Sequence, residues 1–190
     1  MNPPNIISLG RLLVTPIIAW LMLTGAHEGA FWLFLLAAFS DALDGAIAKR
    51  FDMVTLLGSY LDPIADKVML VSVFLVLGSL GHLPLWIVLL VFSRDALIVG
   101  GALLLALLGR SILRMKPLMV SKVNTVCQIV LAAAVLGLIG LDLSVDLLST
   151  LGGIVDILMF AVAASTLVSG AVYLVSWARS INHPVEESEE

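Results

Sequence analysis

The chain has 190 residues, of which 61% are hydrophobic, and its mean hydropathy is +1.12. These values exclude an ordinary soluble globular domain and predict a protein embedded in a membrane. The net charge of −4 comes from four glutamates among the last five residues, because the rest of the chain has ten acids and ten bases. The acidic balance therefore says nothing about a substrate, and we expect no nucleic-acid partner.

Six apolar stretches predict an all-α integral membrane protein with six transmembrane helices. Each stretch is close to the roughly 20 residues that a helix needs to cross a bilayer. The stretches cover residues 6–24, 31–50, 56–79, 84–108, 120–140 and 149–177. Because the turns between them are short, we expect one membrane domain over residues 1–180, followed by a disordered acidic tail at 181–190.

The positive residues at the ends of these stretches predict the orientation. On one side of a six-span arrangement lie Lys49, Arg50, Arg110, Arg114, Lys116, Lys122 and Arg179. The turns on the opposite side contain no lysine or arginine, so both termini are predicted to be cytoplasmic. The N-terminal stretch has no basic segment before it and no Arg/Ser-rich transit segment. We therefore expect a first span rather than a signal peptide, in a bacterial inner membrane.

Four aspartates stand out in the second and third predicted helices. Asp41 and Asp44 are three residues apart, and Asp62 and Asp66 are four apart, so each pair lies on one helix face. A carboxylate at membrane depth costs about 2.5–3.5 kcal/mol, so four of them need to be neutralised. Hard divalent cations take several oxygen ligands. Two such helices facing each other would form a metal site near the cytoplasmic side.

The spacing of this segment resembles the signature of the CDP-alcohol phosphotransferases. The matching string is Asp41-x2-Asp44-Gly45-x2-Ala48-Lys49-x8-Gly58-x3-Asp62-x3-Asp66. In that family an alcohol hydroxyl attacks the β-phosphorus of a CDP-linked substrate, and CMP leaves. The resemblance implies a two-metal site for Mg²⁺ or Mn²⁺, held by Asp41, Asp44, Asp62 and Asp66.

The same resemblance implies roles for further residues. Asp66 would be the general base, and the cytidine nucleotide would be framed by Asn5, Gly45, Ala48, Lys49 and Gly58. Lys49 stands where the family usually has arginine, so it would contact phosphate as a point charge without the bidentate fork of a guanidinium. Arg11 matches the family's first span. It would either extend to the lipid headgroups or face the site and hold phosphate, and we favour the second.

The second half of the chain is expected to select the acceptor alcohol. Arg94 and Asp95 lie in the middle of the fourth predicted helix. They form either a local ion pair or a site where Arg94 binds the phosphate of the acceptor, and we favour the latter. Later comes Lys116-Pro-x3-Ser121-Lys122-x-Asn124-Thr125, which resembles an element of the cardiolipin synthases of the mitochondrial and bacterial type. Alternatively, this segment is a basic cytoplasmic loop that binds anionic lipid headgroups and has no role in acceptor binding.

The resemblance to cardiolipin synthases implies a specific reaction, in which CDP-diacylglycerol and phosphatidylglycerol give cardiolipin and CMP. The acceptor would be bound by Arg11, Arg94, Lys116, Lys122 and Asn124, and the protein would be a homodimer among membrane lipids. One alternative is a phosphatidylglycerophosphate synthase, which uses glycerol 3-phosphate as acceptor. A small cation transporter is a third hypothesis, disfavoured because the aspartates cluster on one membrane side and no second half mirrors them.

Overall fold

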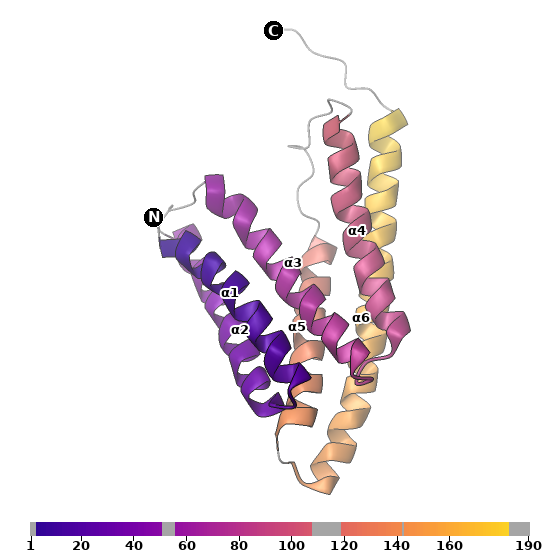
Figure 1. Cartoon of the computed structure of the whole chain (residues 1–190). Coiled ribbons are helices and arrows are strands. Elements are labelled where there is room, and N and C mark those ends of the chain that lie inside the picture. The colour runs from indigo at the N-terminus through magenta and orange to yellow at the C-terminus, as the bar shows by residue number, and fades with distance from the viewer. Residues whose placement is uncertain (1–2, 51–55, 108–118, 142, 183–190) are drawn as a thin grey trace.

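The computed structural model describes residues 3–50, 56–107, 119–141 and 143–182 (Figure 1). Side chains are described for residues 9–40, 65–101 and 119–141 and for most of 143–176. These residues form six helices: α1 (Pro3–Leu23), α2 (His27–Arg50), α3 (Leu56–Ser79), α4 (Leu85–Leu107), α5 (Met119–Gly140) and α6 (Val145–Asn182). The predicted all-helical architecture is confirmed. The predicted tail at 181–190 falls almost wholly outside the described residues.

The sixth helix is longer than the sequence predicts. The prediction covered residues 149–177, whereas α6 runs from Val145 to Asn182. Hydropathy detects only the apolar part of a helix, and α6 extends beyond it to include Asp146 at its start and Arg179 near its end. The backbone hydrogen bonds continue through the more polar residues at both ends.

The outer surface of the bundle is apolar. In the described part of the chain, two segments are long and apolar enough to cross a membrane: Met119–Gly140 and Thr150–Ser176. Large apolar side chains are also exposed on every helix, among them Trp20, Phe39, Leu75, Phe92 and Phe160. Such continuous exposed apolar area is typical of a surface covered by lipid. Crossing by all six helices, and the orientation of the termini, stay predictions.

The helices pack as a closed ring. Around the ring, α3 contacts α1, α1 contacts α2, α2 contacts α5, α5 contacts α6, α6 contacts α4, and α4 returns to α3. A further contact between α3 and α5 crosses the interior. The apolar core includes Phe34, Phe74, Ile18, Met22 and Leu131. In Figure 1, α1 begins and α6 ends at the same end of the bundle.

Two tight turns at the opposite end connect neighbouring helices. Gly25 follows α1 and Gly81 follows α3, with φ values of 81° and 79°. Glycine adopts this left-handed conformation without the steric cost that other residues meet. The rings of His27, at the start of α2, and His82, in the turn after α3, pack edge to face with centroids 5.9 Å apart. These features hold the two turns side by side.

Close packing at the end of α5 leads to a stability prediction. A Cβ atom on Gly140 would lie 2.7 Å from the backbone oxygen of His27 and 2.8 Å from its carbonyl carbon. Since backbone cannot move aside as a flexible side chain can, Gly140→Ala should lower the free energy of unfolding by about 1–3 kcal/mol. Thermal unfolding in detergent measures the effect. Gly153→Ala is the matched control, because nothing lies within 4 Å of its new Cβ. It should be neutral or stabilising by about 0.5–1 kcal/mol, and equal stability of the two variants would contradict the packing.

Candidate active site

Polar side chains are buried inside the ring beside its apolar core. Eight polar or charged side chains are buried in the described part of the chain: Arg11, Thr15, Arg94, Asp95, Asn124, Gln128, Thr166 and Ser169. They come from α1, α4, α5 and α6. A buried polar group costs free energy unless it is hydrogen-bonded or paired. The contacts that these residues make therefore define the candidate site.

Asp66, the predicted general base, lies at this polar interior. Its Oδ1 forms an ion pair with Nη1 of Arg11, and this pair joins α3 to α1. The side chain of Arg11 is 3% exposed, whereas that of Asp66 is 33% exposed. Arg11 is therefore buried against Asp66 and does not extend to the headgroups, in keeping with the favoured alternative. Its contact with phosphate stays a prediction.

Arg94 is the centre of a second buried network. Its Nη1 donates to Oδ1 of Asp95 over 2.5 Å, and its Nη2 donates to Ser121 over 2.6 Å and to Ser169 over 2.8 Å. The local Arg94–Asp95 ion pair is thus present, although consecutive helical residues point in different directions, because the long arginine side chain turns back. The two serines tie α4 to α5 and α6. Binding of an acceptor by Arg94 stays a prediction.

Lys67 completes this network and is a residue that the sequence analysis missed. Its Nζ lies 2.8 Å from Oδ1 of Asp95, so one carboxylate oxygen pairs with two cations. The ion pair joins α3 to α4 at the residue that follows Asp66 in the sequence. In the sequence, a lysine beside an aspartate motif gives no signal of its own. Its distance of 28 residues from Asp95 hides the pairing.

Asn124 is also buried, next to α6. Its Oδ1 accepts hydrogen bonds from Ser165 over 2.7 Å and from Thr166 over 2.9 Å. Because both hydroxyls hold the oxygen, the amide nitrogen points away from them. Lys122, two residues earlier, is exposed. The predicted acceptor element therefore divides into a buried asparagine and an exposed lysine, and contact of either with an acceptor stays a prediction.

The other predicted site residues are placed only along the backbone. Asn5 lies in α1, and α2 carries Asp41, Asp44, Gly45, Ala48 and Lys49. Gly58 and Asp62 lie in the first turns of α3, while Lys116 lies outside the described residues. Among the described residues, α1 packs against both α2 and α3, so it joins the two helices that carry the aspartates. Convergence of the four carboxylates stays a prediction.

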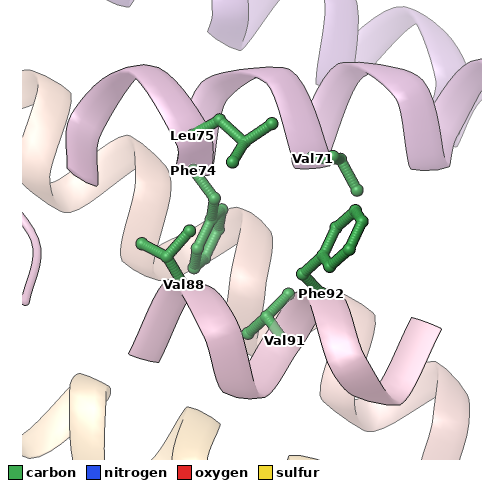
Figure 2. A pocket seen from close by; sticks show the side chains of 6 residues that line it. All are labelled: Val71, Phe74, Leu75, Val88, Val91 and Phe92. Atoms are coloured by element: carbon green, nitrogen blue, oxygen red, sulfur yellow. The ribbon is translucent and has the colours of Figure 1, made fainter. Parts of the chain in front are cut away.

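A shallow pocket between α3 and α4 is not part of this polar site. Figure 2 shows its six lining side chains, which are all apolar: Val71, Phe74, Leu75, Val88, Val91 and Phe92. Leu75 and Phe92 are half exposed on the outer surface. A pocket without polar side chains offers no group for proton transfer or phosphate binding. This pocket therefore lies outside the candidate site.

The sequence comparisons assign the chain to a family. A family model described as CDP-alcohol phosphatidyltransferase matches residues 1–168. The chain belongs to this family. Residues 1–168 include all four aspartates, Arg11 and the Arg94 network apart from Ser169. The resemblance found in the sequence is confirmed.

Relatives within the CDP-alcohol phosphatidyltransferase family carry two kinds of name. The chain is 36% identical over 154 residues to a chloroplastic CDP-diacylglycerol–glycerol-3-phosphate 3-phosphatidyltransferase of Oryza sativa, covering 72% of the chain and 46% of the relative. It is 31% identical over 188 residues to a cardiolipin synthase (CMP-forming)/mitochondrial hydrolase fusion protein of Schizosaccharomyces pombe, and this match covers 91% of the chain and 30% of the relative. A CDP-diacylglycerol–glycerol-3-phosphate 3-phosphatidyltransferase of Bacillus subtilis is 31% identical over 150 residues, covering 71% and 76%. The chain thus spans less than half the length of the first two.

The side chains of this phosphatidyltransferase family member suit a divalent metal by their chemistry. Aspartate oxygens are the ligands that Mg²⁺ and Mn²⁺ prefer. Asp66 is one third exposed, so its carboxylate is open to a ligand as well as to Arg11. Among the described side chains, which do not include those of Asp41, Asp44 and Asp62, no three from His, Cys, Asp or Glu gather.

Proposed function

We propose that the chain transfers a phosphatidyl group from CDP-diacylglycerol to phosphatidylglycerol, giving cardiolipin and CMP. The observation that carries this proposal is Asp66, a partly exposed carboxylate held by Arg11 in the polar interior of an apolar ring. A general base needs a fixed position and access to the substrate. The family membership supports the phosphatidyl donor.

Asp66 would act on the hydroxyl of the acceptor alcohol. The hydroxyl oxygen forms a bond to the β-phosphorus, the bond from that phosphorus to the CMP oxygen breaks, and the proton passes to the Asp66 carboxylate. Arg11 fixes the orientation of this carboxylate through the ion pair. Divalent metal, held by Asp41, Asp44, Asp62 and Asp66, would neutralise the pyrophosphate and the leaving CMP.

The choice of acceptor rests on the second half of the chain. The Lys116–Thr125 element and the Arg94-Asp95 pair resemble those of cardiolipin synthases, which supports phosphatidylglycerol. Glycerol 3-phosphate is the second candidate, because two of the relatives are named for that acceptor. Both acceptors carry a phosphate and a free hydroxyl on one glycerol unit. The site in the bacterial inner membrane would face the cytoplasm, in a homodimer.

A purified-protein assay distinguishes these acceptors. The full chain in detergent is supplied with CDP-diacylglycerol and Mg²⁺ or Mn²⁺, with phosphatidylglycerol and glycerol 3-phosphate offered separately. We expect CMP release and cardiolipin with phosphatidylglycerol, loss of turnover on chelation with EDTA, and recovery when metal is restored. Turnover with glycerol 3-phosphate alone would overturn the acceptor but keep the family chemistry. CMP release without an acceptor would contradict both.

A further inference from the structure

Three cations of the described chain lie in the polar interior, and they differ in access. The side chains of Arg11 and Arg94 are 3% and 6% exposed, whereas that of Lys67 is 35% exposed. A ligand that enters beside Asp66 can therefore reach the ammonium group of Lys67. The two guanidinium groups are enclosed by protein.

Arg94 and Lys67 also differ in how many of their donors are bonded to protein. Both terminal nitrogens of Arg94 donate to protein partners, namely Asp95, Ser121 and Ser169. The ammonium of Lys67 has three donors, and within the described residues it makes one ion pair, to Asp95. Within the described residues, the other donors of the Lys67 ammonium remain for a ligand.

The charge balance of the cluster also favours an anion. Lys67 and Arg94 share the single carboxylate of Asp95, so the three side chains carry a net charge of +1. Arg11 and Asp66 form a neutral pair. In an interior of low dielectric, an excess positive charge is stabilised by a nearby negative group. The excess lies on the side where Lys67 is exposed.

We propose that Lys67 binds the phosphate group of the acceptor while Asp66 receives the acceptor's hydroxyl. This proposal rests on the proposed function and deepens it. The Cα atoms of consecutive residues are about 3.8 Å apart. Asp66 pairs toward α1 and Lys67 toward α4, so their charged groups flank one stretch of α3. A glycerol unit carries one partner for each of these groups, a phosphate for Lys67 and a free hydroxyl for Asp66.

A phosphate on a glycerol unit can come from a lipid or from a soluble metabolite. Phosphatidylglycerol presents it as a diester, and glycerol 3-phosphate presents it as a monoester. Both place the hydroxyl and the phosphate at opposite ends of the same three-carbon unit. The chemistry that Lys67 recognises is common to both, and binding measurements with each ligand separate them.

The test is direct binding to the full chain in detergent, without CDP-diacylglycerol, so that no turnover is needed. Titration calorimetry with glycerol 3-phosphate and with short-chain phosphatidylglycerol compares wild type with Lys67→Gln and Lys67→Arg. Lys67→Gln should weaken binding of the acceptor about 10- to 100-fold, the effect of losing a charge-assisted hydrogen bond. Lys67→Arg should keep the affinity within about threefold. Affinity for CDP-diacylglycerol should not change in either variant.

A purely structural role for Lys67 gives a different pattern. If Lys67 served only to hold α4 through Asp95, Asp95→Asn would weaken acceptor binding as much as Lys67→Gln does. Under the proposal, Asp95→Asn removes the group that competes with the phosphate, so binding is unchanged or tighter. Equal affinity of Lys67→Gln and wild type overturns the proposal for Lys67 alone. A wild-type protein that binds neither acceptor overturns the proposed function as well.

Discussion

Asp66→Asn should reduce the rate of CMP release about 10²- to 10⁴-fold, the usual contribution of a general base. The amide has nearly the same shape as the carboxylate, but it neither accepts the hydroxyl proton nor neutralises Arg11. CDP-diacylglycerol is bound by other groups, so its dissociation constant should change much less than the rate. Single-turnover CMP release, together with a separate binding titration, measures both quantities.

Asp156→Asn is the matched control for this prediction. Asp156 is an exposed aspartate on α6, away from the buried network, so its change to asparagine should leave the rate within about twofold. Loss of CDP-diacylglycerol binding in Asp66→Asn, in parallel with the rate, would instead assign Asp66 to substrate binding. Wild-type ion flux in vesicles that requires no nucleotide would favour the transporter hypothesis.

Arg94→Met should lower the free energy of unfolding by about 3–5 kcal/mol, the cost of removing one partner from a buried ion pair. The methionine fills much of the volume, but it leaves Asp95 with Lys67 alone and deprives Ser121 and Ser169 of their donor. Chemical or thermal unfolding in detergent, followed by tryptophan fluorescence, measures the loss. The effect is one of stability, separate from any role of Arg94 toward the acceptor.

Two further variants test this reasoning. Ser93→Ala should change stability by less than about 0.5 kcal/mol, because Ser93 is exposed and its hydroxyl donates only to Leu90 of the same helix. The double variant Arg94→Met/Asp95→Leu should be less stable than Arg94→Met, because it also removes the carboxylate that pairs with Lys67. A double variant as stable as the single one would show that the Lys67–Asp95 pair adds no stability.

The helices could be predicted from the sequence, but their order around the ring could not. Long apolar runs separated by short polar turns indicate helices directly, and all six were found within a few residues of their observed ends. In a soluble helix, polar residues mark the outer face. Here the outer face is apolar as well, so hydropathy does not distinguish it from the core. No pattern in the sequence indicates that α5 contacts both α2 and α3.

The site was predictable where charges follow a fixed spacing. The aspartate motif identified the family, and Arg11, a single charge inside an apolar run, was expected at the site and pairs with Asp66. Ser169 could not be found, because it is one serine in an apolar helix, 75 residues from Arg94. Lys67 was overlooked for a related reason, since its partner is on another helix. Pairings between distant helices need the three-dimensional arrangement.

The pairing of Lys67 and Arg94 with Asp95 has a consequence for how the chain enters the membrane during synthesis. These three charges belong to α3 and α4, which are consecutive and joined by a short turn at Gly81. When α4 leaves the ribosome, α5 and α6 have not yet emerged from it, so Ser121 and Ser169 cannot help. The hairpin nonetheless contains the carboxylate that its own cations need, which lowers the cost of placing them in lipid. The later helices then dock onto a pair of helices whose two cations already have a carboxylate partner.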